Sequence, residues 1–180
     1  LTIEDIERVP EDVALPGTHQ RYNAALAGLA MRQLSSPEVT DAAIWAGAQS
    51  AVWPARMQRL GEGPVTRLGG GADVWLAGGH NPHAATAIAE LLRQMGGRTV
   101  MVTAMMASKD HGGFFHPFKG VTEAVFTIPN APGHAGADPV ALADTARAFL
   151  PEAIACASID MAMAKAAALK FLQRPTTGRA

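Results

Sequence analysis

The junction Val74–His83 constrains the fold of this chain more than any other feature. An apolar run stops there abruptly at Gly78-Gly79, and Asn81 and Pro82 follow two residues later. Because Asn caps helices and Pro suits their first turn, the pattern predicts a strand, a tight turn and a helix N-terminus. Such a turn leaves backbone N–H groups and the positive end of a helix dipole near the strand's tip. An anion or a substrate carboxylate can bind there.

The residues before Trp53-Pro54 differ in pattern from those after it. Leu1–Pro16 is acidic and lacks clear periodicity, which indicates a linker or a strand separated from its neighbour. Apolar residues recur at helical spacing over Gln20–Leu34 and again over Pro37–Ser50. We therefore expect two helices before the break.

After Trp53-Pro54, predicted strands alternate with predicted helices. Val65–Leu68 and Val74–Ala77 flank the glycine-rich segment Gly69–Asp73, which is expected to be a hairpin loop, with a flexible linker as the alternative. We interpret its three glycines as structural, in preference to a phosphate-binding loop. The further expected elements are helix His83–Met95, strand Arg98–Ala104, helix Asp110–His116, strand Glu123–Ile128, helix Pro139–Leu150 capped by Asp138, strand Ala153–Cys156 and helix Ser158–Leu172. Alternation of this kind requires crossover connections. It predicts an α/β fold with a mainly parallel, Rossmann-like sheet and helices on both faces.

Three polar loops follow predicted strands. They are Ala77–Pro82, Met105–Asp110 and Thr127–Asn130. Because the loops after parallel strands share one edge of a sheet, and open α/β sheets bind ligands at that edge, we expect the three loops to converge on one surface.

Composition limits the kinds of partner. With 180 residues, 48% of them hydrophobic, the chain can bury one core, or one domain with an attached piece. The 15 basic and 16 acidic residues are dispersed, so we expect no nucleic acid and no membrane as partner.

The single cysteine, Cys156, is expected to be a buried structural thiol and indicates a reducing compartment. The most apolar stretch, Ile154–Leu172, contains Asp160 and Lys165, and we expect a cytoplasmic protein.

His80 and Asn81 are the first candidates for a functional role. Asn81 is expected to cap the following helix, and His80 either faces a ligand or is an ordinary surface residue of the turn. His83, His111 and His116 allow a metal interpretation in principle. Histidine spacing alone supports it weakly, because first-row metal sites need three or four convergent ligands.

Lys109 and Arg56 are the candidate cations. Lys109 lies in Ser108-Lys109-Asp110 after a predicted strand, so it either reaches a substrate carboxylate or belongs to a solvated helix start. Arg56 follows Pro54 at the break, where it can bind phosphate or form an interdomain salt bridge. The 180 residues contain no Gly-x-x-x-x-Gly-Lys-Ser/Thr, Gly-x-Gly-x-x-Gly, Gly-x-Ser-x-Gly or Cys-x-x-Cys motif.

Four ordered segments resemble a known family. They are Leu15–Ala25 (LPGTHQRYNAA), Trp53–Gln58 (WPARMQ), Leu76–Pro82 (LAGGHNP) and Lys109-Asp110. In this order and at this spacing they are similar to the landmarks of folylpolyglutamate synthase/dihydrofolate synthase, a relative of the Mur ligases. The resemblance is clear over Leu15–Asp110 and continues by pattern beyond it.

The resemblance implies an ATP-dependent amide ligase that uses Mg²⁺. In that family a substrate carboxylate is phosphorylated, and the amine of L-glutamate attacks the acyl phosphate. The positions matching Asn23, Arg56 and Ala77 meet ATP through adenine, phosphate and ribose respectively. His80, with a catalytic role, Asn81 and Lys109 would lie toward glutamate and the acyl phosphate. An Arg for phosphate, a Lys for a carboxylate and a helix N-terminus between them suit this chemistry.

Two departures from the family pattern affect these expectations. The family has Asp where this chain has Ala77, so one hydrogen-bond acceptor is missing. The family's P-loop, magnesium ligands and most of its folate pocket belong to an N-terminal ATPase domain. The resemblance therefore implies that residues 1–52 are the tail of a central ATPase domain, a linker plus two helices. Residues 53–180 would form a C-terminal glutamate-ligase domain without its last strand, catalytically inactive alone.

Three functions remain open from the sequence. The first is the C-terminal part of a ligase that adds L-glutamate to dihydropteroate, to folates or to both, with its own N-terminal ATPase domain as partner. The second is a non-catalytic nucleotide- or amino-acid-binding module derived from that ligase, which Ala77 favours. The third is a metal-dependent hydrolase using His80, His83 and His111, which predicts stoichiometric bound metal.

Overall fold

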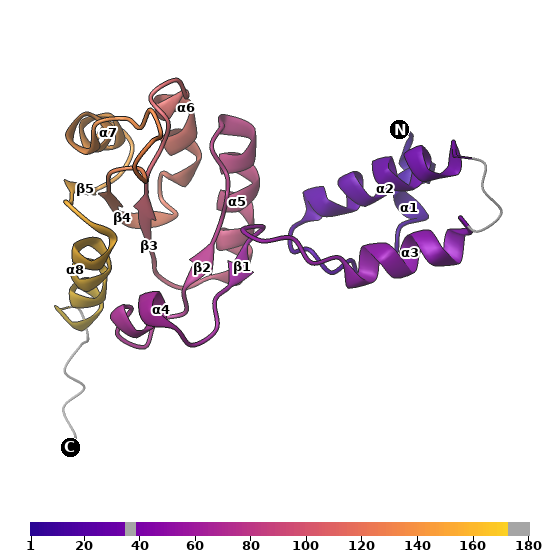
Figure 1. Cartoon of the computed structure of the whole chain (residues 1–180), viewed down its shortest axis with the longest axis horizontal. Helices are drawn as coiled ribbons and strands as arrows, with labels where there is room; N and C mark the ends of the chain where they lie inside the picture. Colours follow the sequence, from indigo (N-terminus) through magenta and orange to yellow (C-terminus); the bar gives the residue numbers. More distant parts are fainter. Residues whose placement is uncertain (35–38, 173–180) are drawn as a thin grey trace, which may run out of the picture. The chain divides into compact units, whose positions relative to one another are not determined.

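The computed structural model describes residues 1–34 and 39–172. They divide into two compact units (Figure 1). Unit 1 comprises Leu1–Gln58 and Leu76–Gly78, and unit 2 comprises Arg59–Trp75 with the residues from Gly79 onward. Within the described ranges, none of the helices has both the length and the apolar character needed to cross a membrane.

Unit 1 is helical, with α1 (Ile3–Glu7), α2 (Thr18–Arg32) and α3 (Asp41–Ser50). The two helices predicted before Trp53-Pro54 are confirmed as α2 and α3, while Pro37 and Glu38 lie outside the described residues. The prediction that Leu1–Pro16 is a linker or strand is wrong at α1. A capping box starts this helix: the Thr2 hydroxyl accepts from Asp5 N, and the Asp5 carboxylate accepts from Thr2 N.

Arginines fasten the helices of unit 1 to one another. Arg21 donates from Nη2 to the carbonyl oxygen of Val9 at 3.0 Å, after the end of α1. Arg32 on α2 pairs with Asp41 on α3 at 2.8 Å, and its guanidinium lies 5.3 Å from the centre of the Trp45 ring. These contacts join the helices through side chains that are amphipathic, with apolar stems and charged heads.

The main sheet of unit 2 has three parallel strands, β3 (Thr99–Thr103), β4 (Thr122–Thr127) and β5 (Glu152–Ala155), in the order β3-β4-β5. The helices of this part are α5 (Pro82–Met95), α6 (His111–Phe115), the 3₁₀ turn η1 (His116–Phe118), α7 (Pro139–Ala146) and α8 (Ile159–Leu172). Helices separate the strands along the chain, as parallel pairing requires. The predicted α/β fold with a mainly parallel sheet is confirmed.

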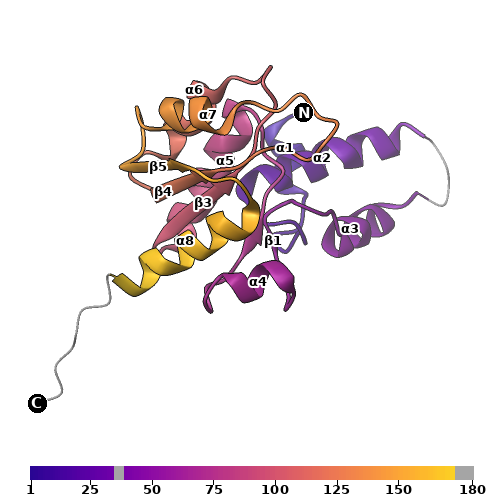
Figure 2. The same ribbon diagram turned by 60° about the vertical axis from the view of Figure 1, so that its left-hand side comes forward.

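Helices cover both faces of this sheet, so the central strand β4 is buried on both faces. Val125 packs with Phe115 and Leu142 into a core beneath α5, α6 and α7. Its neighbours Ala124 and Phe126 point to the other face and pack with Ala162 of α8. Figure 2 shows α8 on one side of the strands and α6 and α7 on the other. Cys156 is buried in the second cluster, as predicted.

The predicted hairpin before the sheet is wrong in one strand. β2 (Trp75–Leu76) forms within the predicted Val74–Ala77, but its partner is β1 (Gln58–Arg59), and α4 (Pro64–Leu68) replaces the predicted strand Val65–Leu68. Pro64 occupies the first turn of α4, where its missing N–H costs nothing, and the Thr66 hydroxyl accepts from Gly63 N at 2.8 Å. This local start of a helix overrides the strand propensity of Val65-Thr66. β2 does not belong to the three-stranded sheet.

Candidate functional site

Two of the three predicted loops meet at the carboxyl edge of the sheet. The loop after β3, residues 104–110, and the loop after β4, residues 128–138, form a short antiparallel bridge between Met106 and Gly136. Ala107 N donates to Ala135 O at 3.0 Å, and Ala137 N donates to Met105 O at 2.8 Å. Within the predicted bounds, Asn130 Nδ2 donates to Met106 Sδ at 3.3 Å, so the expected convergence is confirmed for Met105–Asp110 and Thr127–Asn130.

The start of α5 belongs to the same edge through its packing on α6. Asn81 caps α5, since its Oδ1 accepts from Ala84 N at 2.9 Å, which confirms the predicted cap. A Cβ atom on Gly113 of α6 would lie 2.7 Å from Cγ of Pro82, so the first turn of α5 lies directly against α6. Because β2 lies outside the parallel sheet, this packing, and not strand order, brings the turn before α5 to the edge.

His80 and Lys109 flank this contact between α5 and α6. His80 is exposed in the turn that leads into α5, and Lys109 is half-buried just before α6. Among the described residues Lys109 has no ion pair, so no salt bridge within these residues occupies its ammonium group. The positive end of the 14-residue α5 and the Lys109 ammonium bring positive charge to this edge, and the Asp110 carboxylate that caps α6 brings one negative charge.

Arg56 lies in unit 1 on a strained turn. Its neighbours Ala55 and Met57 have φ values of 60° and 49°, in the left-handed region that non-glycine residues rarely adopt. Met57 is buried, Arg56 is exposed, and Ala55 O accepts from Gly78 N at 2.7 Å. Each such conformation costs about 1–3 kcal/mol and clusters at functional sites. The turn presents Arg56 to solvent beside the segment that carries Ala77, which is also exposed.

Asn23 lies on the exposed side of α2, in a chain of polar side chains. Its Nδ2 donates to Gln20 Oε1 at 3.0 Å, and Gln20 Nε2 lies 3.0 Å from His19 Nε2. Asn23 and Gln20 also line a cavity of about 460 Å³ between α2 and α3, whose other walls are mostly apolar. The three candidate nucleotide-binding residues thus lie in unit 1, and His80, Asn81 and Lys109 lie in unit 2.

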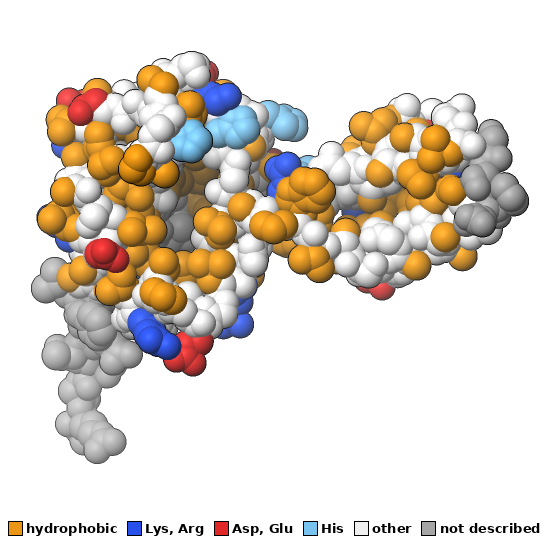
Figure 3. Space-filling view, in the orientation of Figure 1, with side chains coloured by type: hydrophobic (Ala, Val, Ile, Leu, Met, Phe, Trp, Pro, Cys, Tyr) orange, Lys and Arg blue, Asp and Glu red, His pale blue; other side chains and the backbone are white. Residues whose placement is uncertain are grey.

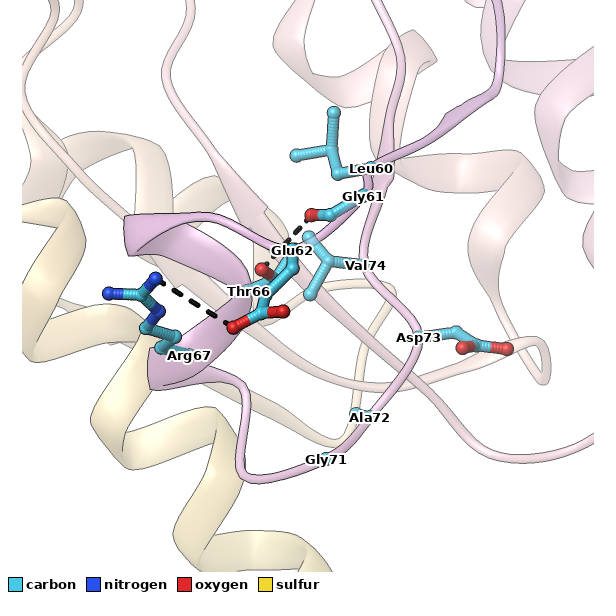
Figure 4. A pocket seen from close by; sticks show the side chains of 9 residues that line it. All are labelled: Leu60, Gly61, Glu62, Thr66, Arg67, Gly71, Ala72, Asp73 and Val74. Carbon is cyan, nitrogen blue, oxygen red and sulfur yellow. Dashed lines mark hydrogen bonds and ion pairs between the residues drawn. The ribbon is translucent and has the colours of Figure 1, made fainter.

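A second cavity, of about 340 Å³, lies in unit 2 between α4 and the segments around β1 and β2 (Figure 4). Arg67 faces Glu62 there, with Nη2 and Oε1 3.7 Å apart, and both side chains are exposed. None of the predicted site residues lines this cavity. Its glycine-rich wall connects α4 to β2, in keeping with the structural interpretation of those glycines.

Histidine side chains gather over α5 and α6 on the face shown in Figure 3. Within the described part of the chain, however, no group of three or more His, Cys, Asp or Glu side chains is arranged to hold a metal ion. His116 instead packs edge-on against the Phe149 ring, with 5.7 Å between the ring centres. His111 bonds to the backbone of residues 104–110.

Two features of the site have no signal in the local sequence. One is the pair of left-handed residues around Arg56, since Ala and Met do not favour that conformation. The other is the set of contacts made by Met106: its Sδ accepts from Asn130 Nδ2 at 3.3 Å, and its carbonyl oxygen lies 3.0 Å from His111 Nε2. The Asn130 contact joins residues 24 positions apart, beyond the reach of any periodicity.

Comparisons with known proteins agree with this architecture. The family model described as Mur ligase, glutamate ligase domain, matches residues 55–175. Folylpolyglutamate synthase of Mycobacterium tuberculosis, solved with ADP and AMPPCP, is 20% identical with a TM-score of 0.64, over 91% of this chain and 42% of that chain. FolC of E. coli, solved with ADP, is 27% identical with a TM-score of 0.64, over 92% of this chain and 35% of that one.

A third solved structure contains more of the relevant ligands. The bifunctional folylpolyglutamate synthase/dihydrofolate synthase of Yersinia pestis, with Mn, AMPPNP and L-glutamate bound, is 24% identical with a TM-score of 0.53, over 81% of this chain and 39% of that chain. This chain therefore spans between about a third and two fifths of the length of these three structures. No curated protein matches the sequence.

Proposed function

We propose, from the premise that this chain belongs to the Mur ligase family through its glutamate ligase domain, that it is the C-terminal part of an ATP-dependent amide-forming ligase. The ligase would add L-glutamate to dihydropteroate, to folates or to both. The observation that carries this proposal is the edge of unit 2 where the first turn of α5 lies against α6, close to Lys109. Donors and positive charge at such an edge suit an amino acid with two carboxylates.

The proposed reaction has two steps. The γ-phosphoryl group of ATP moves to a carboxylate oxygen of the pterin substrate, which gives an acyl phosphate and ADP. The amine nitrogen of L-glutamate then attacks the carbonyl carbon, the bond from carbon to the phosphate oxygen breaks, and phosphate and a proton leave. Magnesium would be held by the N-terminal ATPase domain and would neutralise phosphate charge.

In unit 1, we assign the nucleotide to Asn23, Arg56 and Ala77. Arg56 would bind phosphate, because its exposed guanidinium offers a planar fork of donors on a fixed turn. Asn23 would meet adenine from the mouth of the cavity between α2 and α3. Ala77 would lie at the ribose, where it provides a methyl group in place of a carboxylate.

In unit 2, we assign glutamate and the acyl phosphate to His80, Asn81 and Lys109. Lys109 would bind a carboxylate of glutamate, and His80 would lie beside the reacting acyl phosphate as a catalytic residue. The side chain of Asn81 is already bonded to Ala84 N, so its contribution is to hold the start of α5 in place. Since Pro82 has no N–H and Ala84 N is bonded to Asn81, the N–H of His83 is the group of that first turn that would face the anion.

Residues 1–52 would be the tail of the central ATPase domain and residues 53–180 the ligase domain. Support comes from the family model, which matches residues 55–175, and from the change of architecture between the helical unit 1 and the α/β unit 2. Unit 1 also includes residues 53–58 and 76–78, so the proposed boundary lies a few residues before the division between the two units. The P-loop and the magnesium ligands would be supplied by the protein's own N-terminal domain, which makes that domain the main partner.

The proposal is tested on the complete ligase that contains this chain. Purified enzyme is incubated with ATP, Mg²⁺, L-glutamate and either dihydropteroate or a reduced folate. We expect ADP release that requires L-glutamate, together with a product heavier than its substrate by one glutamyl residue. If neither pterin substrate gives that product, the proposed substrate class is wrong.

The exposed Ala77 at the end of β2 favours a second candidate, a binding module without ligase activity. The same assay separates the two candidates. A non-catalytic module would bind nucleotide or glutamate in isothermal titration calorimetry and give no glutamyl product with either pterin.

A further inference from the structure

Two hydrogen bonds in the loop that carries Lys109 meet at the same acceptor, the carbonyl oxygen of Met106. Lys109 N donates to this oxygen at 3.2 Å, which closes a tight turn. The Nε2 atom of the His111 ring lies 3.0 Å from the same oxygen. A carbonyl oxygen has two lone pairs and can accept from both groups at once. Since a carbonyl has no proton to give, the His111 ring donates through Nε2–H.

The other side of this loop is held by the loop after β4. Met106 forms the antiparallel bridge with Gly136, and its sulfur accepts from Asn130 Nδ2. A Cβ atom on Gly136 would lie 2.7 Å from Cβ of Asn130, so only glycine permits this close approach. The loop after β4 thus holds Met106 in place. The two hydrogen bonds to the Met106 carbonyl oxygen then fix Lys109 N and the His111 ring relative to Met106.

We propose that His111 is a positioning residue for Lys109. Through the Met106 carbonyl it holds the turn that sets where the Lys109 ammonium lies relative to the start of α5. This inference rests on the proposed function, in which Lys109 binds a carboxylate of glutamate. His111 itself does not touch the substrate. The Asp110 side chain completes the arrangement, since its Oδ1 accepts from Gly113 N at 2.9 Å and fixes the start of α6.

The test compares two substitutions of His111 in the complete ligase. His111→Gln keeps an N–H donor near the position of Nε2, and His111→Leu removes it. We expect His111→Leu to raise the KM for glutamate by about 2- to 10-fold, the range that one neutral hydrogen bond corresponds to. We expect His111→Gln to stay within about 2-fold of the parent enzyme, since it retains the bond. The KM for ATP should not change in either variant.

Two further variants separate positioning from general damage. In a Lys109→Ala background, His111→Leu should add no further increase in the KM for glutamate, because the group it positions is gone. His116→Leu is the matched control: His116 lies at the end of the same helix and packs on Phe149. It should leave the KM for glutamate unchanged. Equal additional effects of His111→Leu with and without Lys109 would overturn the proposal.

The failures of the inference and of the proposed function are distinguishable. If Lys109→Ala raises the KM for glutamate and His111→Leu does not, the inference is wrong and the proposed function stands. If Lys109→Ala does not change the KM for glutamate, the role assigned to Lys109 is wrong, and the inference about His111 is wrong with it. Should His111→Leu not fold, the ¹⁵N chemical shifts of the His111 ring in the parent protein show which ring nitrogen carries the proton. A ring protonated at Nδ1 alone would overturn the inference.

Discussion

The half-buried position of Lys109 makes its ammonium a strong candidate ligand for a carboxylate. A charged group that is partly withdrawn from water binds an opposite charge more strongly than a fully solvated one. We predict that Lys109→Ala in the complete ligase raises the KM for glutamate by about 10- to 100-fold, as expected for the loss of a charge-assisted bond of about 1.5–3 kcal/mol. The KM for ATP should change much less, and steady-state kinetics measure both.

Lys119→Ala is the matched control for that prediction. Lys119 is exposed after η1, away from the loop of residues 104–110 in sequence, and it has no ion pair within the described ranges. Its removal should leave both Michaelis constants unchanged. A KM for ATP that rises as steeply as that for glutamate in Lys109→Ala would assign Lys109 to the nucleotide instead.

Position 77 tests the nucleotide assignment of unit 1. The exposed Ala77 follows β2 beside the strained turn of Arg56, and the resemblance of the sequence to folylpolyglutamate synthase implies Asp at this position. We predict that Ala77→Asp lowers the KM for ATP or for glutamate in the complete ligase. A restored charge-assisted bond corresponds to about 1.5–3 kcal/mol before desolvation. Ala148→Asp, on an exposed residue after α7, should have no effect. If Ala77→Asp changes neither constant nor kcat, this position does not face a ligand.

At the scale of the element, α5 depends on its first turn. Asn81 caps it, and replacement of such a cap by Ala costs about 0.5–2 kcal/mol. We predict that Asn81→Ala lowers the free energy of unfolding of the 180-residue chain by that amount in urea denaturation, and that Asn81→Asp restores most of it. An unchanged midpoint in Asn81→Ala would mean that packing on α6 alone fixes the start of the helix.

The strand pair β3-β4 carries a pH-dependent contact at its beginning. Arg98 donates from Nε to Glu123 Oε1 at 2.6 Å, and this hydrogen bond lowers the pKa of Glu123. A carboxyl group with a lowered pKa stabilises the fold above its unfolded pKa and loses that effect as the pH falls through its folded pKa. Because both side chains are more than a third exposed, the contribution is at most about 1 kcal/mol.

We therefore predict a small stability difference between the parent chain and Glu123→Gln at pH 7 that disappears below the lowered pKa of Glu123. Urea denaturation at pH 7 and at a series of progressively more acidic pH values measures it. The matched control is Glu90→Gln on the exposed side of α5, which should show no comparable difference at pH 7. A difference that stays unchanged throughout the acidic series would exclude ionisation of Glu123 as its cause.

Local sequence predicts an element well when its signal and its cause are both local. The start of α5 is an example, since Asn81 and Pro82 act on the turn they belong to. It fails at α4, where the β-branched Val65 and Thr66 suggest a strand but Gly63-Pro64 and the Thr66 hydroxyl start a helix. It also fails for the contacts of Met106, because loops far apart in sequence meet only after the parallel sheet has formed.

At the scale of the whole molecule, the parallel sheet follows from the alternation of strands and helices, and the family from four short segments. Neither the alternation of strands and helices nor the four short segments establishes the roles of the six candidate site residues. Asn23, Arg56 and Ala77 lie in unit 1, and His80, Asn81 and Lys109 lie in unit 2. The local patterns predict the helix cap at Asn81, but they do not determine which ligand any of the six residues would contact.

The last prediction concerns what these 180 residues can do without the rest of a ligase. Phosphoryl transfer requires a phosphate cradle and a bound divalent cation. The sequence has no Gly-x-x-x-x-Gly-Lys-Ser/Thr loop, and residues 1–34 and 39–172 hold no cluster of three metal-binding side chains. We predict that the purified chain releases no ADP in response to a folate and L-glutamate together, while the complete ligase at the same molar concentration does. ADP release by the chain alone that requires both substrates would place the catalytic machinery within these residues, and the assignment of phosphoryl transfer to an N-terminal domain would be wrong.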